Sequence, residues 1–406
     1  MYKEKVVENK AVTEVKAPLG FKAGGIHCGI KKSRKDLALI VSELPATAAA
    51  VFTLNKVQAA PVLVSKKILS ESKCHKAIII NSGNANACTG PEGDENAQKM
   101  IDETAKMLGV ESDKIFVAST GVIGEQLPIE KIISGIQNIG PELKGRNFSA
   151  AAEAIMTTDT FVKTVSSTFQ MNGEEVTIYG MAKGSGMIHP NMATMLGFVL
   201  TDAAIDKNNF QKLLKKSTDR TFNRIIVDGD TSTNDMVIAL ANGASGASVI
   251  PETESYQIFE EELYQVLKKL SIDIVRDGEG ATKVIEITVE GALNNADAEK
   301  AARTVALSPL VKTAIHGEDA NWGRIIAAVG YSGIDFDPAK FEIIINGIQI
   351  LHQDYLVKLS NAEANLSLVG PDIELLINLN GGEGKATCWT CDFSEEYVKI
   401  NGSYRS

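Results

Sequence analysis

Residues 161–179 read FVKTVSSTFQMNGEEVTIY, with strand-like runs on either side of Asn172-Gly173. The same pattern recurs where residues 341–345 and 348–351 flank Asn346-Gly347. Asn-Gly favours the two-residue turn of a β-hairpin, because both central residues of that turn need a positive φ. Both segments are therefore predicted to fold as antiparallel hairpins.

Helices and further strands are predicted around these hairpins. Short β-branched runs indicate strands, and apolar residues at helical spacing indicate amphipathic helices. The expected strands are residues 76–80, 115–118 and 198–200. The expected helices are residues 96–108, 206–222, 256–275 and 296–307, with one more that begins at Pro128. Hairpins mixed with helices predict α/β layers with antiparallel or mixed sheets, rather than a doubly wound parallel sheet.

The length and the charge of the chain indicate how many domains to expect and argue against some classes of partner. The chain has 406 residues, with 51 acidic and 41 basic side chains and a formal charge of −10. This length predicts about two or three domains, each with its own core. The acidic balance argues against a nucleic-acid partner and against a membrane surface, and no run reaches about 18 apolar residues. We expect a cytoplasmic globular protein.

The cysteines do not form a disulfide pattern. They are odd in number and scattered, at Cys28, Cys74, Cys88, Cys388 and Cys391. Reduced thiols are therefore expected. The spacing of Cys388 and Cys391 also occurs in zinc and redox sites, but no second ligand pair follows, so packing is the favoured interpretation and no metal is expected.

An unusual loop, KGSGMIHPNMATMLG at residues 183–197, precedes the strand expected at 198–200. Its glycines make phosphate binding conceivable, but Lys183 precedes them and a strand follows, whereas a phosphate loop has its lysine after the glycines and opens a helix. A second interpretation is that Thr194 is a nucleophile, freed by cleavage after the small residue Ala193. Its own α-amine, with a pKa of about 7.7–8.0, would then act as the base. One Ala-Thr dipeptide does not establish this chemistry.

Five motifs in order resemble the ornithine acetyltransferase family, the glutamate N-acetyltransferases of arginine biosynthesis. They are NSGNANACTG (81–90), STGVIG (119–124), KGSGMIHPNMATMLG (183–197), VDGDTSTND (227–235) and GEDANWGR (317–324). The resemblance runs from about Pro18 to the C-terminus. It implies an αββα sandwich of the N-terminal-nucleophile type, joined to a smaller C-terminal α/β domain.

The resemblance also implies an activity. The precursor would cut itself between Ala193 and Thr194 into an α chain, residues 1–193, and a β chain, residues 194–406, which includes the smaller domain. Thr194 would take acetyl from N2-acetylornithine and pass it to glutamate in a ping-pong exchange. No cofactor is implied. Whether acetyl-CoA also serves as an acetyl donor is left open, and the expected assembly contains two α and two β chains.

Site residues follow from the same resemblance. Thr120 and Gly121 match the pair that stabilises the oxyanion. The substrate-binding positions are Thr157, Lys183, Thr194, Glu279, Asn401 and Ser406, the last of which is commonly threonine in the family. Lys183 would face the carboxylate of an amino acid and Glu279 its ammonium. From the residues alone, the favoured interpretation is that these two charges are solvated loop residues and that Thr157 caps a helix end.

Other assignments stay open. His189 could act as a base, although the threonine amine already supplies one, and His316 is interpreted as structural. An N-terminal-nucleophile aminopeptidase or amidase would need the same threonine chemistry, with water as acceptor. A non-catalytic ligand-binding protein with the same fold would remain uncut and unacetylated.

Overall fold

The structure is a computed structural model that describes residues 15–189 and 195–403. Its larger body contains an eight-stranded sheet. The strands are β1 (Phe21–Ile26), β2 (Leu37–Phe52), β3 (His75–Asn84), β4 (Ile115–Val122), β5 (Lys163–Met171), β6 (Glu174–Lys183), β7 (Leu196–Thr201) and β9 (Met236–Ala241). Seven of them follow the order β4-β3-β2-β9-β7-β6-β5, and β1 pairs with the first part of β2. The pairs β3–β4 and β7–β9 are parallel and the others antiparallel.

The long strand β2 joins the two halves of this sheet. Its first part pairs with β1 and β3, and its second part, Thr47–Phe52, pairs with β9. Phe198 and Leu240 share one apolar core with Leu39 of the first half. Val199, next to Phe198 on β7, belongs instead to a second core, as expected from the alternation of side chains along a strand.

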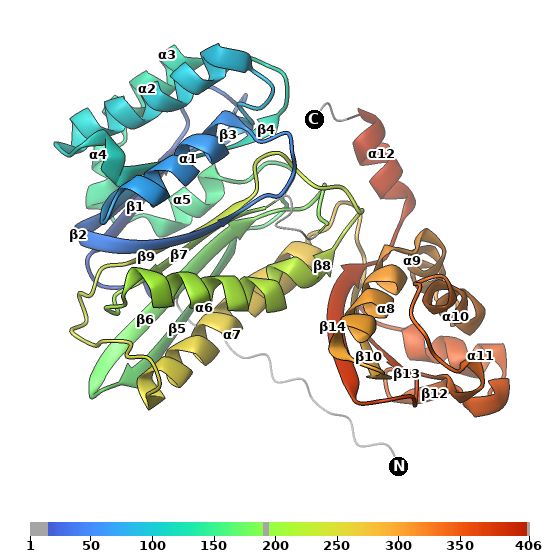
Figure 1. Ribbon diagram of the computed structural model, residues 1–406. Helices are drawn as coiled ribbons and strands as arrows, with labels where there is room; N and C mark the ends of the chain where they lie inside the picture. Colours follow the sequence, from blue (N-terminus) through green and yellow to red (C-terminus); the bar gives the residue numbers. More distant parts are fainter. Residues whose placement is uncertain (1–14, 190–194, 404–406) are drawn as a thin grey trace.

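Helices cover the outer face of each of these two halves of the sheet (Figure 1). The helices of the larger body are α1 (Ala60–Glu71), α2 (Gly90–Leu108), α3 (Ile129–Asn138), α4 (Gly140–Lys144), α5 (Phe148–Ala154), α6 (Lys207–Arg220) and α7 (Glu254–Arg276). The group α1 to α3 packs on the β3–β4 side, whereas α6 and α7 cover the half that contains β5 and β6. The layers therefore follow the expected αββα order.

A second, six-stranded sheet forms the smaller C-terminal domain. Its strands are β8 (Ile225–Ile226), β10 (Val284–Ala292), β11 (Glu342–Ile345), β12 (Ile348–Leu351), β13 (Asp372–Asn378) and β14 (Gly384–Cys391), in the order β12-β11-β13-β10-β14-β8. The helices that follow the larger body are α8 (Asn295–Leu307), α9 (Pro309–His316), α10 (Trp322–Gly330), α11 (Asn361–Asn365) and α12 (Glu395–Ser403). The edge strand β8 comes from the middle of the chain, so the two bodies share this sheet.

Both predicted hairpins are confirmed. Asn172 and Gly173 have φ values of 56° and 84°, and Asn346 and Gly347 have values of 47° and 77°. The predicted helices and strands are also present, and Asp206 caps α6 by accepting the N–H groups of Asn208 and Asn209. The first predicted helix begins earlier than expected, at Gly90, because Pro91 fits the first turn, where its missing N–H costs little.

Candidate active site

Several stretches of chain that are distant in sequence meet around a pocket of about 610 Å³. Its lining residues are Ala85, Thr120, Gly121, Ile123, Thr157, Thr158, Lys183, Gly186, Met187, Ser232, Asn234, Glu279 and Asn401. Six residues named from the resemblance are among them: Thr120, Gly121, Thr157, Lys183, Glu279 and Asn401. The remaining three, Ala193, Thr194 and Ser406, lie outside the described residues.

Thr120 and Gly121 lie at the end of β4, beside its parallel neighbour β3. Gly121 pairs with Gly83 and has a φ of 135°, where a side chain would be strained. A Cβ at this position would lie 2.3 Å from the carbonyl carbon of Gly83. Glycine is therefore required for this close approach. Thr120 is buried and borders the pocket directly.

Lys183 ends β6 and brings a buried positive charge to the pocket. Its side chain is 4% exposed, and its Nζ donates to the hydroxyl of Thr120 at 3.4 Å. Burial lowers the pKa of Lys183, while the nearby carboxylate of Asp159 acts in the opposite direction. An anionic ligand would therefore compensate for lost hydration of this ammonium.

Glu279 brings a negative charge to the same pocket and is 8% exposed. Its Oε2 accepts the side-chain N–H of Asn401, from α12, at 2.8 Å. The backbone of the glycine-rich loop wraps around this carboxylate: a Cβ on Gly186 would lie 2.4 Å from its carbon. Lys183 and Glu279 thus provide opposite charges in one pocket, the complement of a zwitterionic amino acid.

Three buried charges that the sequence reasoning did not single out support this pocket. Lys163 on β5 donates to the carboxylates of Asp159 and Asp277, and all three side chains are almost fully buried. Burial alone would raise the pKa of Asp159, but Lys183 and Lys163 outweigh it and lower the pKa to about 2. The signal available in the sequence was an aspartate two residues from Thr157 and another two residues from Glu279.

These two aspartates also bind backbone groups of the pocket. Asp159 accepts the N–H of Thr157 at 2.9 Å and that of Gly184 at 2.7 Å. Asp277 accepts the N–H of Thr160 at 2.9 Å, and its backbone carbonyl accepts the hydroxyl of Ser185. The charge cluster therefore fixes the three segments that carry Thr157, Lys183 and Glu279.

The loop before β9 holds the beginning of β7. Asp235 accepts the N–H of Met195 at 2.9 Å, and burial raises its pKa well above the ordinary value. Asn234 donates to the carbonyls of Ala85 and Ser119, at 2.6 and 2.9 Å. This loop therefore connects the residue after Thr194 with the end of β4.

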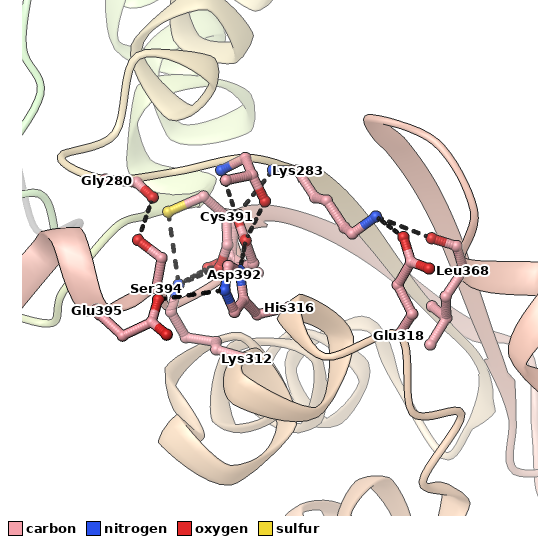
Figure 2. Close-up of polar contacts among 12 residues, drawn as sticks. Gly280, Lys283, Lys312, His316, Glu318, Leu368, Cys391, Asp392, Ser394 and Glu395 are labelled. Carbon is pink, nitrogen blue, oxygen red and sulfur yellow. Dashed lines mark hydrogen bonds and ion pairs between the residues drawn. The ribbon is translucent and has the colours of Figure 1, made fainter.

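A further set of contacts fixes the Glu279 loop to the end of the chain (Figure 2). Asp392 accepts the N–H and hydroxyl of Thr282 at 2.8 and 2.6 Å and the N–H of Lys283 at 2.8 Å. Nδ1 of His316 lies 2.7 Å from the same carboxylate. Because β14 leads through Asp392 into α12, these contacts hold Asn401 near Glu279.

The two histidines named from the sequence have no direct place in the pocket. His316 belongs to the Asp392 contacts, as the structural interpretation predicted. His189 is half-buried and does not line the pocket. Burial and the nearby Arg303 lower its pKa, and its Nε2 has no hydrogen-bond partner among the described residues.

Cys388 and Cys391 are buried in β14 as free thiols. Within residues 15–189 and 195–403, no group of three or more His, Cys, Asp or Glu side chains has the arrangement of a metal site. In the same part of the chain, no helix has both the length and the apolar character needed to cross a bilayer.

Known proteins similar to this chain share nearly its whole length. The bifunctional arginine biosynthesis protein ArgJ of Caldanaerobacter subterraneus subsp. tengcongensis is 48% identical over 398 residues, which cover 97% of this chain and 98% of that protein. ArgJ of Thermotoga neapolitana is 48% identical over 395 residues, which cover 96% and 99%. A crystal structure of ArgJ from Bacillus halodurans matches at 43% identity with a TM-score of 0.49, covering 51% of this chain and 98% of that one.

The match to a family model agrees with these relatives. It extends over residues 22–406, and so includes both sheets and every residue that lines the pocket. The relatives cover almost the full chain at an identity well above what chance allows. The chain belongs to the ArgJ family.

Proposed function

We propose that this chain is a self-cleaving threonine acetyltransferase of arginine biosynthesis, which moves acetyl from N2-acetylornithine to glutamate. The observation that carries the proposal is the pocket that Lys183 and Glu279 line together with the candidate oxyanion pair Thr120 and Gly121, with Lys183 donating to the hydroxyl of Thr120. The names of the full-length relatives, which are arginine biosynthesis proteins, support the same activity.

The first step is self-cleavage. The hydroxyl of Thr194 attacks the carbonyl of Ala193, the amide becomes an ester, and water releases that ester. The products are an α chain of residues 1–193 and a β chain of residues 194–406. Cleavage also frees the amine of Thr194, which then accepts the proton of the hydroxyl. Met195, the residue that follows, is held by Asp235 and lies directly before the buried strand β7.

The second step is acetyl transfer. The hydroxyl of Thr194 attacks the acetyl carbonyl of N2-acetylornithine, ornithine leaves, and the acetyl-threonine ester is then attacked by the amine of glutamate. Both steps form a tetrahedral intermediate with a negative oxygen. Donors at Thr120 and Gly121 stabilise this oxygen, and one such donor is typically worth about 3 kcal/mol.

Apart from Thr194, which belongs to both sets, binding and chemistry use different residues in this proposal. Lys183 pairs with the α-carboxylate of the substrate, and Glu279 pairs with an ammonium group. Asn401 orients Glu279, since its amide donates to that carboxylate. Thr157 and Ser406 complete the set of substrate-binding residues.

The relatives are named bifunctional, and we extend this to the present chain: acetyl-CoA serves as a second acetyl donor for glutamate. Acetyl-CoA is then a co-substrate and no cofactor stays bound. The working enzyme is a cytoplasmic assembly of two α and two β chains.

Intact mass spectrometry tests cleavage and acylation together. The purified parent is expected as two fragments that separate at Ala193 and Thr194. With N2-acetylornithine alone, the fragment beginning with Thr194 should gain the mass of one acetyl group. Thr194→Ala should give one uncut, unlabelled chain, and Thr194→Ser should retain part of both reactions.

Three results would contradict the proposal. An alanine variant that still appears as two fragments excludes Thr194 as the cleavage residue. Rapid release of acetate in the presence of glutamate, without N-acetylglutamate, would identify an amidase that uses water as acceptor. A parent that remains uncut and unlabelled would identify a binding protein.

A further inference from the structure

A loop with four cations in five residues lies between β1 and β2. We call residues 31–35, KKSRK, the basic loop. Its charge contrasts with the formal charge of −10 of the whole chain. Such a concentration of one sign attracts an oppositely charged ligand and orients it.

The buried carboxylate of Asp36 gives this loop a fixed shape. It accepts the backbone N–H groups of four residues that precede the loop or begin it: Cys28 at 2.6 Å, Gly29 at 3.2 Å, Ile30 at 2.7 Å and Lys31 at 2.9 Å. Backbone donors satisfy this carboxylate, so the basic side chains remain available for other partners.

The four cations have different surroundings. Lys35 forms an ion pair with Glu153, and the half-buried Lys31 donates to the carbonyls of Lys35 and Met156. Lys32 and Arg34 are exposed. Among the described residues, neither of them forms an ion pair with a carboxylate, whereas Arg34 donates to the carbonyl of Thr157 at 3.4 Å. Two exposed cations therefore have no compensating anion.

A second cavity connects one of these cations, Arg34, with the active site. It measures about 760 Å³, and its wall includes both Arg34 and Glu279. Thr157, Thr158 and Glu279 line both this cavity and the active-site pocket. The second cavity thus has an exposed arginine of the basic loop in its wall and shares residues with the pocket that Thr120 and Gly121 line.

The part of the second cavity that carries Asp277 and Glu279 is lined by acidic side chains, in contrast to the basic loop. Asp277 also lines the second cavity, but Lys163 compensates its charge. The carboxylate of Glu279, which lines both cavities, accepts the side-chain N–H of Asn401 and forms no ion pair with a cation among the described residues. A long ligand with anionic groups at one end only is therefore favoured in a single direction, with its anionic end at Arg34 and Lys32.

We propose that the basic loop binds the phosphate groups of acetyl-CoA, whose flexible arm passes through the second cavity and brings the thioester to Thr120 and Gly121. This inference rests on the proposed function and extends it to the second acetyl donor. The hydroxyl oxygen of Thr194 forms a bond to the acetyl carbon, and the bond from that carbon to sulfur breaks. The proton that the Thr194 amine took from the hydroxyl passes to the leaving thiolate.

The basic loop distinguishes the two acetyl donors. N2-acetylornithine is short and carries no phosphate, so the charges of Lys183 and Glu279 suffice to hold it. Acetyl-CoA carries several negative charges far from its thioester. A change in the basic loop should therefore affect one donor and leave the other unchanged.

The test is Lys32→Glu, because Lys32 is exposed and is not among the residues that line the active-site pocket. We expect the KM for acetyl-CoA and the Kd for CoA, measured by calorimetry, to rise roughly five- to tenfold, the range of one exposed charge-assisted contact replaced by a repulsive charge. kcat/KM for N2-acetylornithine should stay within about twofold. Added salt should reduce the difference between variant and parent.

Lys67→Glu is the matched control, since Lys67 is an exposed lysine on α1 and gives the same change in net charge. Arg34→Ala provides a second variant, with the ratio of the two activities as its readout, because Arg34 also contacts the backbone of Thr157. An unchanged KM for acetyl-CoA, an equal loss for both donors, or an equal effect of Lys67→Glu would overturn the inference.

The parent protein separates this inference from the proposed function. A parent that transfers acetyl from N2-acetylornithine but does not bind CoA would overturn the inference and leave the ornithine reaction intact. A parent that binds CoA through Lys32 but transfers nothing from N2-acetylornithine would support the loop assignment and overturn the proposed exchange.

Discussion

Lys163 and Lys312 are two lysines buried to the same degree, with 1% of each exposed. Lys163 lies beside the active-site pocket and donates to the carboxylates of Asp159 and Asp277. Lys312 lies on α9 in the smaller domain (Figure 2). It donates to the hydroxyl of Thr390 at 2.7 Å, to the carbonyl of Cys391, and to the Cys391 sulfur at 3.7 Å.

The difference between them is the charge of their partners. Two buried carboxylates contact Lys163, so removing it would take away the ion-pair partner that both of them share. The contacts of Lys312 are neutral groups and the ring of Phe393, whose centroid is 4.5 Å away. Burial lowers the pKa of Lys312. A buried lysine is therefore essential where it neutralises carboxylates, and more replaceable where it only fills space and donates hydrogen bonds.

The largest effect is expected for Lys163→Met. This change removes the shared ion-pair partner of the buried Asp159 and Asp277, and breaking a buried ion pair in this way typically costs about 3–5 kcal/mol of unfolding free energy. Transfer should fall as well, because these aspartates hold the segments of Thr157, Lys183 and Glu279. Urea unfolding and steady-state kinetics measure the two effects.

A double variant makes this prediction more specific. Lys163→Met with Asp277→Asn removes one of the unpaired charges, and should recover part of the lost unfolding free energy. Equal stability of the single and double variants would contradict the role assigned to the charge cluster.

Glu279→Gln should have the next largest effect, and on binding rather than on stability. It removes the charge that holds an ammonium before, during and after the chemistry, so KM should rise more than kcat falls. The expected loss is about 1.5–3 kcal/mol, roughly ten- to hundredfold in kcat/KM. Steady-state kinetics on N2-acetylornithine and glutamate provide the measurement. A variant with unchanged constants would make Glu279 a structural charge, like those around Lys163.

Lys312→Met should cost less than Lys163→Met. Replacing a buried charge by an apolar side chain of similar length is often close to neutral, and we expect a change within about 2 kcal/mol. Urea unfolding at neutral pH compares the two variants directly. If both lysines were equally sensitive, the charge of their partners would not be the deciding factor.

The smallest expected effect is the contribution of Lys312 to the pH dependence of the unfolding free energy. Because burial lowers the pKa of Lys312 in the folded protein, the unfolded chain binds more protons between that lowered value and the ordinary lysine pKa of about 10.4. In that range, this residue makes the unfolding free energy rise with pH. The Lys312→Met variant lacks this contribution, so the parent should gain stability relative to it as the pH approaches 10.4. A constant difference across this range would show that Lys312 titrates normally.

Local signals in the sequence predicted much of the secondary structure. Asn172-Gly173 and Asn346-Gly347 gave the correct hairpins because a positive φ at both positions is a local requirement. The pairing of the second sheet was harder to predict from the sequence. Its strand β8 consists of Ile225 and Ile226 and pairs with Trp389 and Thr390, more than 160 residues later. No local pattern specifies such a pairing.

The candidate site, too, could be predicted only in part from the sequence. The motifs of the family identified Thr120, Lys183 and Glu279, and the structure places them around one pocket. They did not identify the partners of Lys163. Asp159 is four residues away from it, but Asp277 is 114 residues away, and their convergence depends on how β5, β6 and α7 pack.

The sequence by itself determined the types of the elements, the turns of the hairpins and the residues that carry the proposed chemistry, since these depend on short-range backbone preferences and on motifs. The tertiary structure alone decided which charges are compensated and which remain available. Lys163 and Lys32 are both lysines in the printed sequence, but one is buried between two carboxylates and the other is exposed on the basic loop. The physical reason is that hydration and ion pairing depend on neighbours in space, and long-range packing brings those neighbours together.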